Sequence, residues 1–86
     1  MYTNIRINET AYKHKVTESD IRRVLSRPRF DGAVDEAEEN KYLVLGFDNA
    51  GNLLEIMYNL IDEQSINVFH AMKCRKAFLQ YLDYQE

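Results

Sequence analysis

The chain has few of the residues that build disulfides, metal sites or cofactor sites. Its 86 residues include a single cysteine, Cys74, together with one proline, three glycines and no tryptophan. A lone cysteine cannot form an internal disulfide, and it lacks the spaced thiol and histidine neighbours of a zinc site. We therefore expect no metal and no cofactor, and a reducing compartment.

Long apolar runs are also missing. No run approaches the roughly 18 residues that a membrane-spanning helix needs. Met1 is followed by polar residues rather than by the positive start and apolar core of a secretory signal. These absences predict a cytoplasmic protein with no membrane partner. The length predicts a single domain, residues 1–86, with a small core whose stability a homodimer would increase.

The sequence carries no phosphate-binding loop, dinucleotide fingerprint or nucleophile elbow, so the enzyme classes that depend on them have no support. Charge is more informative. The net charge is −3, yet residues 1–29 hold seven basic and three acidic residues, whereas residues 31–39 hold five acidic residues and no basic one. This separation predicts either a basic face beside an acidic loop, or two solvated surfaces with no partner.

The clearest local signal is a helix start at Thr17. Thr17 is a good cap, Asp20 follows three residues later as the acid of a capping box, and Pro28 ends the pattern. A helix over Glu18–Ser26 is therefore predicted. The preceding segment, Asn8–His14, also begins with a capping residue and predicts a short helix of two turns.

Most of the remaining chain favours β-strands separated by turn residues. A hairpin is the strongest of these predictions, because Asp48–Asn52 supplies residues that accept turn conformations between two apolar segments. The predicted segments are, in order, a short strand or extended lead-in at Tyr2–Ile7, an edge strand or loop within residues 29–40, and strands at Lys41–Phe47, Leu53–Leu60 and Ile66–His70.

The last segment changes to a helical period. A helix from Ala71 or Met72 to about Tyr84 is predicted, with an apolar stripe that packs on the sheet. Glu55 is the exception within the hairpin, since it interrupts an otherwise apolar side of its strand. The predicted fold is α+β, with two N-terminal helices, an antiparallel meander of three to four strands, and a C-terminal helix, all helices covering one face of the sheet.

The strongest candidate site is the junction between the last strand and the last helix. It would place His70, Lys73, Cys74 and Arg75 around the positive end of a helix, where a phosphate can bind. His70 could transfer a proton to or from an RNA oxygen. The alternative is that His70 caps the helix or bonds the hairpin, and that Cys74 packs in the core or at its rim.

Two further sets of residues have weaker functional interpretations. His14, between Lys13 and Lys15, is more typical of an exposed or helix-ending histidine than of a catalyst. The arginines of the predicted first long helix and the segment after it could follow a nucleic-acid backbone, although a solvated helix face is the commoner explanation. These arginines are Arg22, Arg23, Arg27 and Arg29.

The whole pattern resembles the BrnT-like toxins of bacterial toxin–antitoxin pairs. The similarity covers most of the chain and is carried by short motifs. They are Asn8–Ile21, Pro28, the Tyr42-Leu43-Val44-Leu45-Gly46 strand, Gly51–Ile56 and the Val68-Phe69-His70-Ala71 junction, which is closest to a subgroup with His-Ala at this point.

The resemblance implies the fold of RelE-type ribonucleases, which cleave RNA without a metal and are neutralised by a small antitoxin that often binds DNA. It suggests His70 as the proton-transfer group. Met72 stands where the family usually carries an arginine, which moves the expected phosphate-stabilising cation to Lys73 or Arg75, with Arg23 as a further candidate. The alternative is a non-catalytic module whose acidic 31–39 segment or basic first helices dock a protein.

Overall fold

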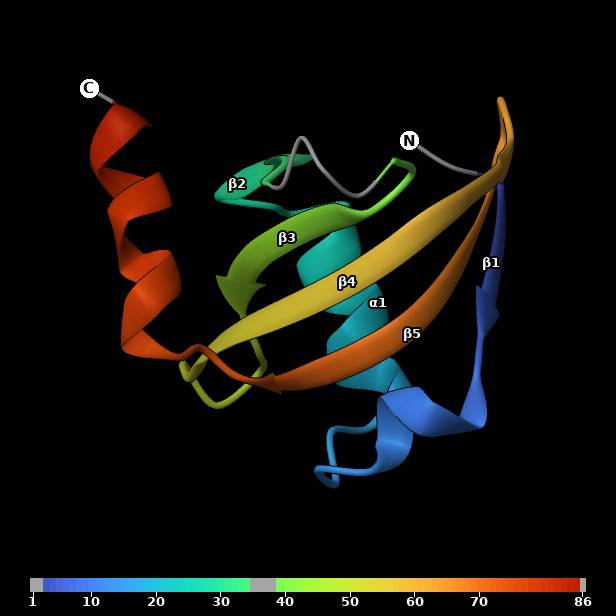
Figure 1. The fold of residues 1–86 in the computed structure, drawn as a ribbon. Helices are drawn as coiled ribbons and strands as arrows, with labels where there is room; N and C mark the ends of the chain where they lie inside the picture. The colour runs from blue at the N-terminus through green and yellow to red at the C-terminus, as the bar shows by residue number, and fades with distance from the viewer. Residues whose placement is uncertain (1–2, 35–38, 86) are drawn as a thin grey trace.

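The computed structural model describes residues 3–34 and 39–85 and places a five-stranded sheet at the centre of the protein (Figure 1). The strands lie in the order β1-β5-β4-β3-β2. Tyr2 and the acidic residues at 35, 36 and 38 fall outside the described residues. The elements are β1 (Asn4–Ile7), η1 (Glu9–Tyr12), α1 (Glu18–Ser26), β2 (Phe30–Ala33), β3 (Tyr42–Phe47), β4 (Leu53–Asp62), β5 (Ser65–Lys73) and η2 (Lys76–Gln85).

The protein is α+β, but the predicted arrangement is wrong. The described chain begins with a strand rather than with two helices, and the sheet is mixed rather than an antiparallel meander. β1 pairs in parallel with β5, with Ile5 opposite Ile66 and Ile7 opposite Val68. Both isoleucines pack against the apolar core from this position. Pairing with a distant strand therefore places the two alternating isoleucines of the N-terminal segment, both half-buried, against the core.

The predicted helix over Asn8–His14 is only one short 3₁₀ turn, η1. Asn8 caps it as expected, because the Thr10 backbone N–H donates to Asn8 Oδ1 (3.0 Å). The Thr10 hydroxyl donates to the Phe69 carbonyl (2.7 Å), and Ala11 is fully buried. These anchors hold η1 against β5 just beyond the end of β1. The left-handed conformation of Lys15 (φ 65°) then turns the chain out of the helical path.

Helix α1 is confirmed from Glu18 to Ser26 with Thr17 as its cap. The Asp20 backbone N–H donates to Thr17 Oγ1 (3.2 Å). The Asp20 carboxylate also accepts from the Asn49 backbone N–H (3.1 Å) and from Asn49 Nδ2 (2.9 Å). Asp20 therefore joins the start of α1 to the β3–β4 loop, which has the Asp48–Asn52 boundaries that the sequence predicts.

The largest local correction concerns the strand before the last helix. β5 continues through Ala71, Met72 and Lys73, which the sequence assigns to the helix. The register explains this, since β4 begins at Leu53 and offers partners to all three residues. Strand pairing therefore overrides the local helical period, and η2 starts only at Lys76.

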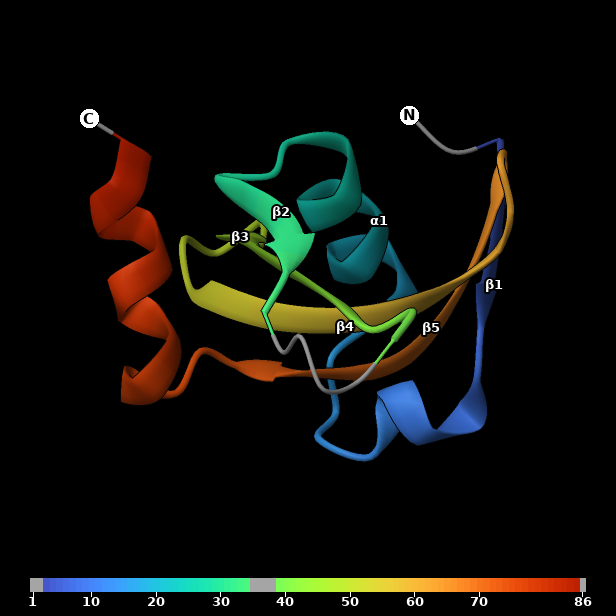
Figure 2. The same ribbon diagram turned by 45° about the horizontal axis from the view of Figure 1, so that its top comes forward.

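Two apolar layers cover opposite faces of the sheet, so the expectation that all helices share one face is also wrong. α1 and η1 pack on one face, named here the α1 face, and η2 packs on the other, named the η2 face. In Figures 1 and 2, α1 lies against β3 and β4, and η2 stands apart from it at the left of the sheet. The α1 face buries Ile21, Val24, Val44, Leu54, Ile56, Tyr58, Ile66, Val68 and Ala71, and the η2 face buries Leu43, Leu45 and Met57 against Phe78, Tyr81 and Leu82.

Across the described ranges, no helix is both long and apolar enough to cross a membrane.

Gly46 allows α1 to approach the sheet closely. A Cβ at this position would lie 2.9 Å from Val24 Cγ1 and 3.4 Å from the Arg27 carbonyl oxygen. We expect Gly46→Ala to lower the free energy of unfolding by about 1–3 kcal/mol, because the helix must shift to relieve the overlap. Denaturant unfolding measures the change.

Two variants control this prediction. Gly32→Ala should lower the free energy of unfolding by less than Gly46→Ala does, because the nearest group is the ring end of Phe30 at 3.2 Å, which can turn aside. Val24→Ala removes the clashing methyl group. It should therefore lower the free energy of unfolding by less in the Gly46→Ala background than in the wild type. Equal costs for Val24→Ala in both backgrounds would contradict the steric account.

Candidate functional site

A buried carboxylate lies at the centre of the candidate site. Glu55 of β4 faces the η2 side and is 0% exposed. Removing a carboxylate from water costs several kcal/mol unless charged and hydrogen-bonding partners surround it. Every hydrogen-bond partner recorded for this carboxylate comes from the segment His70–Arg75, which makes up the last part of β5 and the link to η2.

Arg75 holds both oxygens of the Glu55 carboxylate. Its Nη2 donates to Oε2 (2.7 Å), its Nε lies 3.1 Å from each oxygen, and its backbone N–H donates to Oε1 (2.8 Å). The Cys74 backbone N–H donates to the Leu53 carbonyl (2.9 Å), which fixes the chain just before Arg75. The guanidinium also lies 5.2 Å from the centre of the Phe78 ring. Arg75 is therefore positioned by β4 and by η2 together.

His70 supplies the remaining bond to the carboxylate. Its Nε2 lies 2.8 Å from Glu55 Oε2, and its side chain is 21% exposed. An irregularity in the β4–β5 register, where Met57 pairs with His70 but Tyr58 pairs with Val68, lets Phe69 act as the extra residue of a bulge. The bulge reverses the alternation of β5. His70 therefore faces Glu55, and not the core side that Ile66 and Val68 share.

The charges of this cluster stabilise each other. Burial raises the pKa of Glu55, but the hydrogen bonds from the Arg75 side chain, the Arg75 backbone and His70 outweigh it, so the net pKa lies below its ordinary value. The same carboxylate raises the pKa of Arg75. Glu55 is therefore an anion at neutral pH and can only accept hydrogen bonds.

This pKa shift predicts a loss of stability in acid. Since the folded-state pKa of Glu55 lies below the ordinary value of 4.5, the unfolded state binds the proton first as the pH falls. The contribution of Glu55 to stability is complete well above pH 4.5, and it falls below that pH until the folded-state carboxyl also titrates. The free energy of unfolding, measured by urea titration from pH 7 to pH 2.5, should decrease below about pH 4.5.

The Glu55→Gln variant tests the assignment, because it should be less stable at pH 7 and should show a smaller decrease in acid. Some decrease should remain, because two other acids also have lowered pKa values. Burial raises the pKa of Asp48, but hydrogen bonds from Asn52, Ala50 and Gly51 outweigh it. The backbone N–H of Gln64 lowers the pKa of Asp62. Identical pH dependence in the variant and the wild type would contradict the assignment.

The second histidine of the chain lies against the first. The rings of His14 and His70 are in edge-to-face contact, with centroids 5.9 Å apart and an angle of 75° between their planes. His14 follows η1, and Lys15 then takes a left-handed conformation (φ 65°) that turns the chain toward α1. The anchoring of η1 on β5 therefore brings His14 to His70 across 56 positions of sequence.

Cys74 is not an activated nucleophile in this position. Burial and the negative charge of Glu55 raise the pKa of its thiol, and Arg75 counters them only in part. The thiol donates to the Arg75 carbonyl (3.4 Å) and the side chain packs beside the η2-face core. This agrees with the packing role that the sequence favours for it.

The structure brings together only some of the residues that the sequence singles out. His70 and Arg75 share Glu55, and η2 begins directly after Arg75 at Lys76. The Arg75 backbone N–H at this helix start already donates to the Glu55 carboxylate (2.8 Å), so an internal anion holds the position that the sequence predicts for a phosphate. Lys73 pairs with Leu54, whose side chain packs on the α1 face, so Lys73 points away from Glu55.

The arginines of the first helix lie on the far side of the sheet from His70. Arg22 and Arg23 are exposed on α1, Arg27 caps its end, and Arg22 Nε donates to Glu18 Oε2 (2.8 Å). Because α1 covers the opposite face, Arg23 cannot join His70 in one site. Arg29, also exposed, lies over the Phe47 ring at 5.6 Å.

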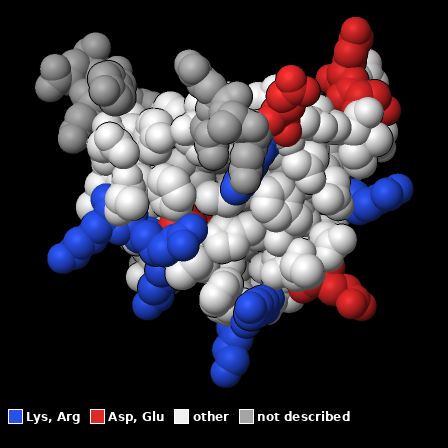
Figure 3. All heavy atoms as spheres, viewed as in Figure 1, with Lys and Arg blue, Asp and Glu red and all other residues white. Residues whose placement is uncertain are grey.

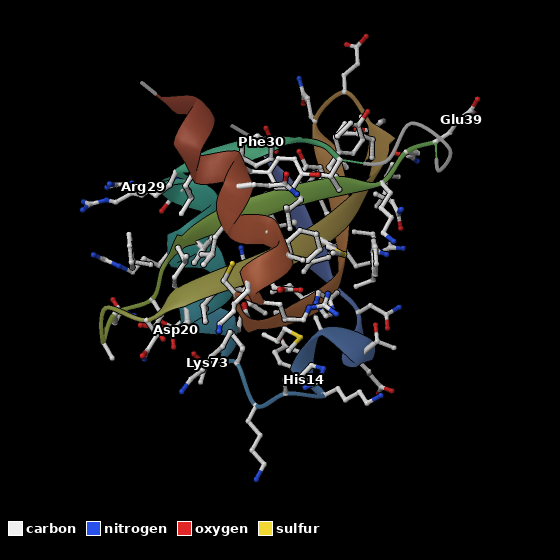
Figure 4. The ribbon with its side chains drawn as sticks, turned by 60° about the vertical axis from the view of Figure 1, so that its left-hand side comes forward. His14, Asp20, Arg29, Phe30, Glu39 and Lys73 are labelled. Carbon is white, nitrogen blue, oxygen red and sulfur yellow. The ribbon has the colours of Figure 1, made fainter. Side chains whose placement is uncertain are left out.

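Basic side chains nevertheless gather near the candidate site. Figure 3 shows Lys and Arg around the start of η2 and along the lower edge, whereas the acidic side chains of this face lie mainly near the β4–β5 turn. Figure 4 shows that His14 and Lys73 both lie at this lower edge. The exposed lysines Lys13 and Lys15 flank His14 in the chain. The site is thus a buried anion with cationic surroundings.

Two residues of the site are not predicted as such from sequence. Glu55 is visible as the charge that interrupts an apolar strand, but its partners are not. His14 has no signal that links it to His70. Within the parts of the chain that are described, no group of three or more His, Cys, Asp or Glu side chains could hold a metal ion. Comparison with family models, with curated proteins and with solved structures finds no match to this chain.

Proposed function

We propose that this protein is a metal-independent ribonuclease of the BrnT/RelE-like kind, a cytoplasmic toxin held inactive by a small, DNA-binding antitoxin. The observation that carries the proposal is the bond between His70 and the buried carboxylate of Glu55. A histidine that a buried carboxylate orients, with part of its ring exposed, is a common arrangement for proton transfer in enzymes.

The Glu55 carboxylate determines which nitrogen of His70 can accept a proton. An ionised carboxylate accepts hydrogen bonds only, so the bonded Nε2 of His70 carries the proton. In the neutral ring the lone pair is then on Nδ1, for which no bond to a described residue is recorded. Nδ1 is the atom that would take the proton of an RNA 2′-hydroxyl. The negative charge of Glu55 would stabilise the imidazolium that forms.

Cationic side chains would supply the attraction for the RNA backbone. Arg75 uses Nε and Nη2 for Glu55, and its side chain remains 53% exposed. It can therefore stabilise a phosphate beside His70 without leaving the carboxylate. Lys13 and Lys15 would contact neighbouring phosphates. The net charge of −3 opposes the approach of a polyanion, but a local group of cations decides where a polyanion docks.

Expression without a partner tests the proposal in cells. The wild type should arrest bacterial growth and degrade RNA, and co-expression of the antitoxin encoded beside it should restore growth. No growth arrest and intact RNA, at a normal level of folded protein, would contradict the proposed ribonuclease activity.

A second candidate is a non-catalytic protein-binding module of the same fold. It is favoured by the hydrogen bonds that both carboxylate oxygens of Glu55 accept within the fold, since a carboxylate with this many partners can serve stability alone. The sequence assigns a docking role to the acidic segment 31–39. One of its residues is engaged within the fold, because the Asp31 carboxylate accepts from the Tyr58 hydroxyl (2.8 Å). A stable complex with the neighbouring gene product and no RNA cleavage by the free protein would support this candidate.

A further inference from the structure

We propose that His14 is a second catalytic residue of this site, the acid that protonates the leaving oxygen when RNA is cleaved. This inference rests on the proposed function. The geometry points to it through the contact of the His14 and His70 rings, 5.9 Å between centroids. These are the two histidines of the chain, and the fold brings them together from η1 and β5, which are far apart in sequence.

The packing of η1 makes this contact part of the fold. The Asn8 backbone N–H donates to the Val68 carbonyl (2.8 Å), and Thr10 bonds to the Phe69 carbonyl (2.7 Å). Both acceptors belong to the stretch of β5 that contains the bulge and leads directly to His70. The bulge that turns His70 toward Glu55 is therefore also the place where the His14 loop is anchored.

The two histidines have different surroundings, which assigns them different roles. His70 is bonded to the Glu55 carboxylate, which stabilises the positive charge that a base acquires. His14 is exposed, lies between two lysines, and has no recorded bond to a described carboxylate. It is therefore the histidine that can exchange protons with water and approach a bound RNA. Hydrogen bonds of roughly 2.6–3.2 Å from two rings at this separation can reach two oxygens of one phosphodiester.

The reaction then balances without a metal. His70 Nδ1 takes the proton of the 2′-hydroxyl, O2′ forms a bond to phosphorus, and the bond from phosphorus to O5′ breaks. A protonated His14 gives its proton to O5′. The products are a 2′,3′-cyclic phosphate and a 5′-hydroxyl. Proton exchange of both histidines with water restores the starting state.

Substrates with two different leaving groups test the role of His14. A uridylyl dinucleotide needs a proton on its leaving oxygen, whereas the 4-nitrophenyl ester of uridine 3′-phosphate releases a stable anion without one. We expect His14→Gln to slow cleavage of the dinucleotide by about 10²- to 10⁴-fold and to cleave the aryl ester at close to the wild-type rate. His70→Gln should slow both reactions.

The outcomes separate this inference from the proposed function. Ser19→Ala, at an exposed position of α1, is the control and should match the wild type on both substrates. Wild-type cleavage with no effect of His14→Gln on the dinucleotide, or with equal losses on both substrates, would overturn the role of His14 alone. A folded wild type that cleaves neither substrate would overturn the proposed function and His14 with it.

Discussion

Arg75→Met is expected to lower the free energy of unfolding by about 3 kcal/mol, because it leaves the fully buried Glu55 carboxylate without its main partner. The value lies at the lower end of the range for buried pairs. Half of the Arg75 side chain is exposed, and His70 would still donate to Glu55. Since domains of this size are stable by only about 5–15 kcal/mol, the loss should be large in urea unfolding.

Companion variants show whether the buried charge is the cause. Arg75→Lys keeps a cation and the backbone N–H but loses the two-pronged contact, so it should cost less than Arg75→Met. Glu55→Met combined with Arg75→Met removes the charge as well and should recover part of the loss. Arg6→Met, at an exposed position of β1, should change stability by no more than about 0.5 kcal/mol. A similar effect of Arg6→Met and Arg75→Met would contradict the account.

His70→Gln is expected to reduce RNA cleavage by about 10²- to 10⁴-fold, the range that removal of a general base or acid produces. Glutamine is chosen because its amide nitrogen can still donate to Glu55 Oε2, whereas it cannot take a proton from a hydroxyl group. The variant should therefore fold. Initial rates on a dinucleotide, measured with excess substrate, provide the comparison.

Stability data separate this effect from unfolding. The midpoint of urea unfolding for His70→Gln should stay close to that of the wild type, while Arg75→Met should move it. If His70→Gln folds and cleaves at the wild-type rate, His70 has no role in proton transfer. If it lowers stability as much as Arg75→Met does, its bond to Glu55 serves the fold.

The parts of the fold that were predictable are those that local chemistry determines. Thr17 caps α1 through its own hydroxyl, and Pro28 prevents the helix from continuing, so both signals lie within a few residues of their effect. The loop at Asp48–Asn52 is similar, because the Asp48 carboxylate accepts from the Ala50 and Asn52 backbone N–H groups. No distant contact is needed for either structure.

The parts that were not predictable depend on partners far away in sequence. Ala71–Lys73 is helical in composition, yet it joins β5 because β4 offers it partners, and Asn4–Ile7 finds its partner about 60 positions later. The positions of the candidate site residues also depend on distant partners. The bulge at Phe69 determines which face of the sheet His70 occupies. The sheet itself separates Arg22, Arg23 and Arg27 from His70.

Metal-independent RNA cleavage is tested by the rate at which the purified, antitoxin-free wild type cleaves RNA in excess EDTA, together with the chemistry of the new ends. We expect steady cleavage that EDTA does not reduce, ends that carry a 2′,3′-cyclic phosphate and a 5′-hydroxyl, and a loss of at least about 100-fold in His70→Gln. A folded wild type that leaves the RNA intact, or one that cleaves it as fast as His70→Gln does, would contradict the claim.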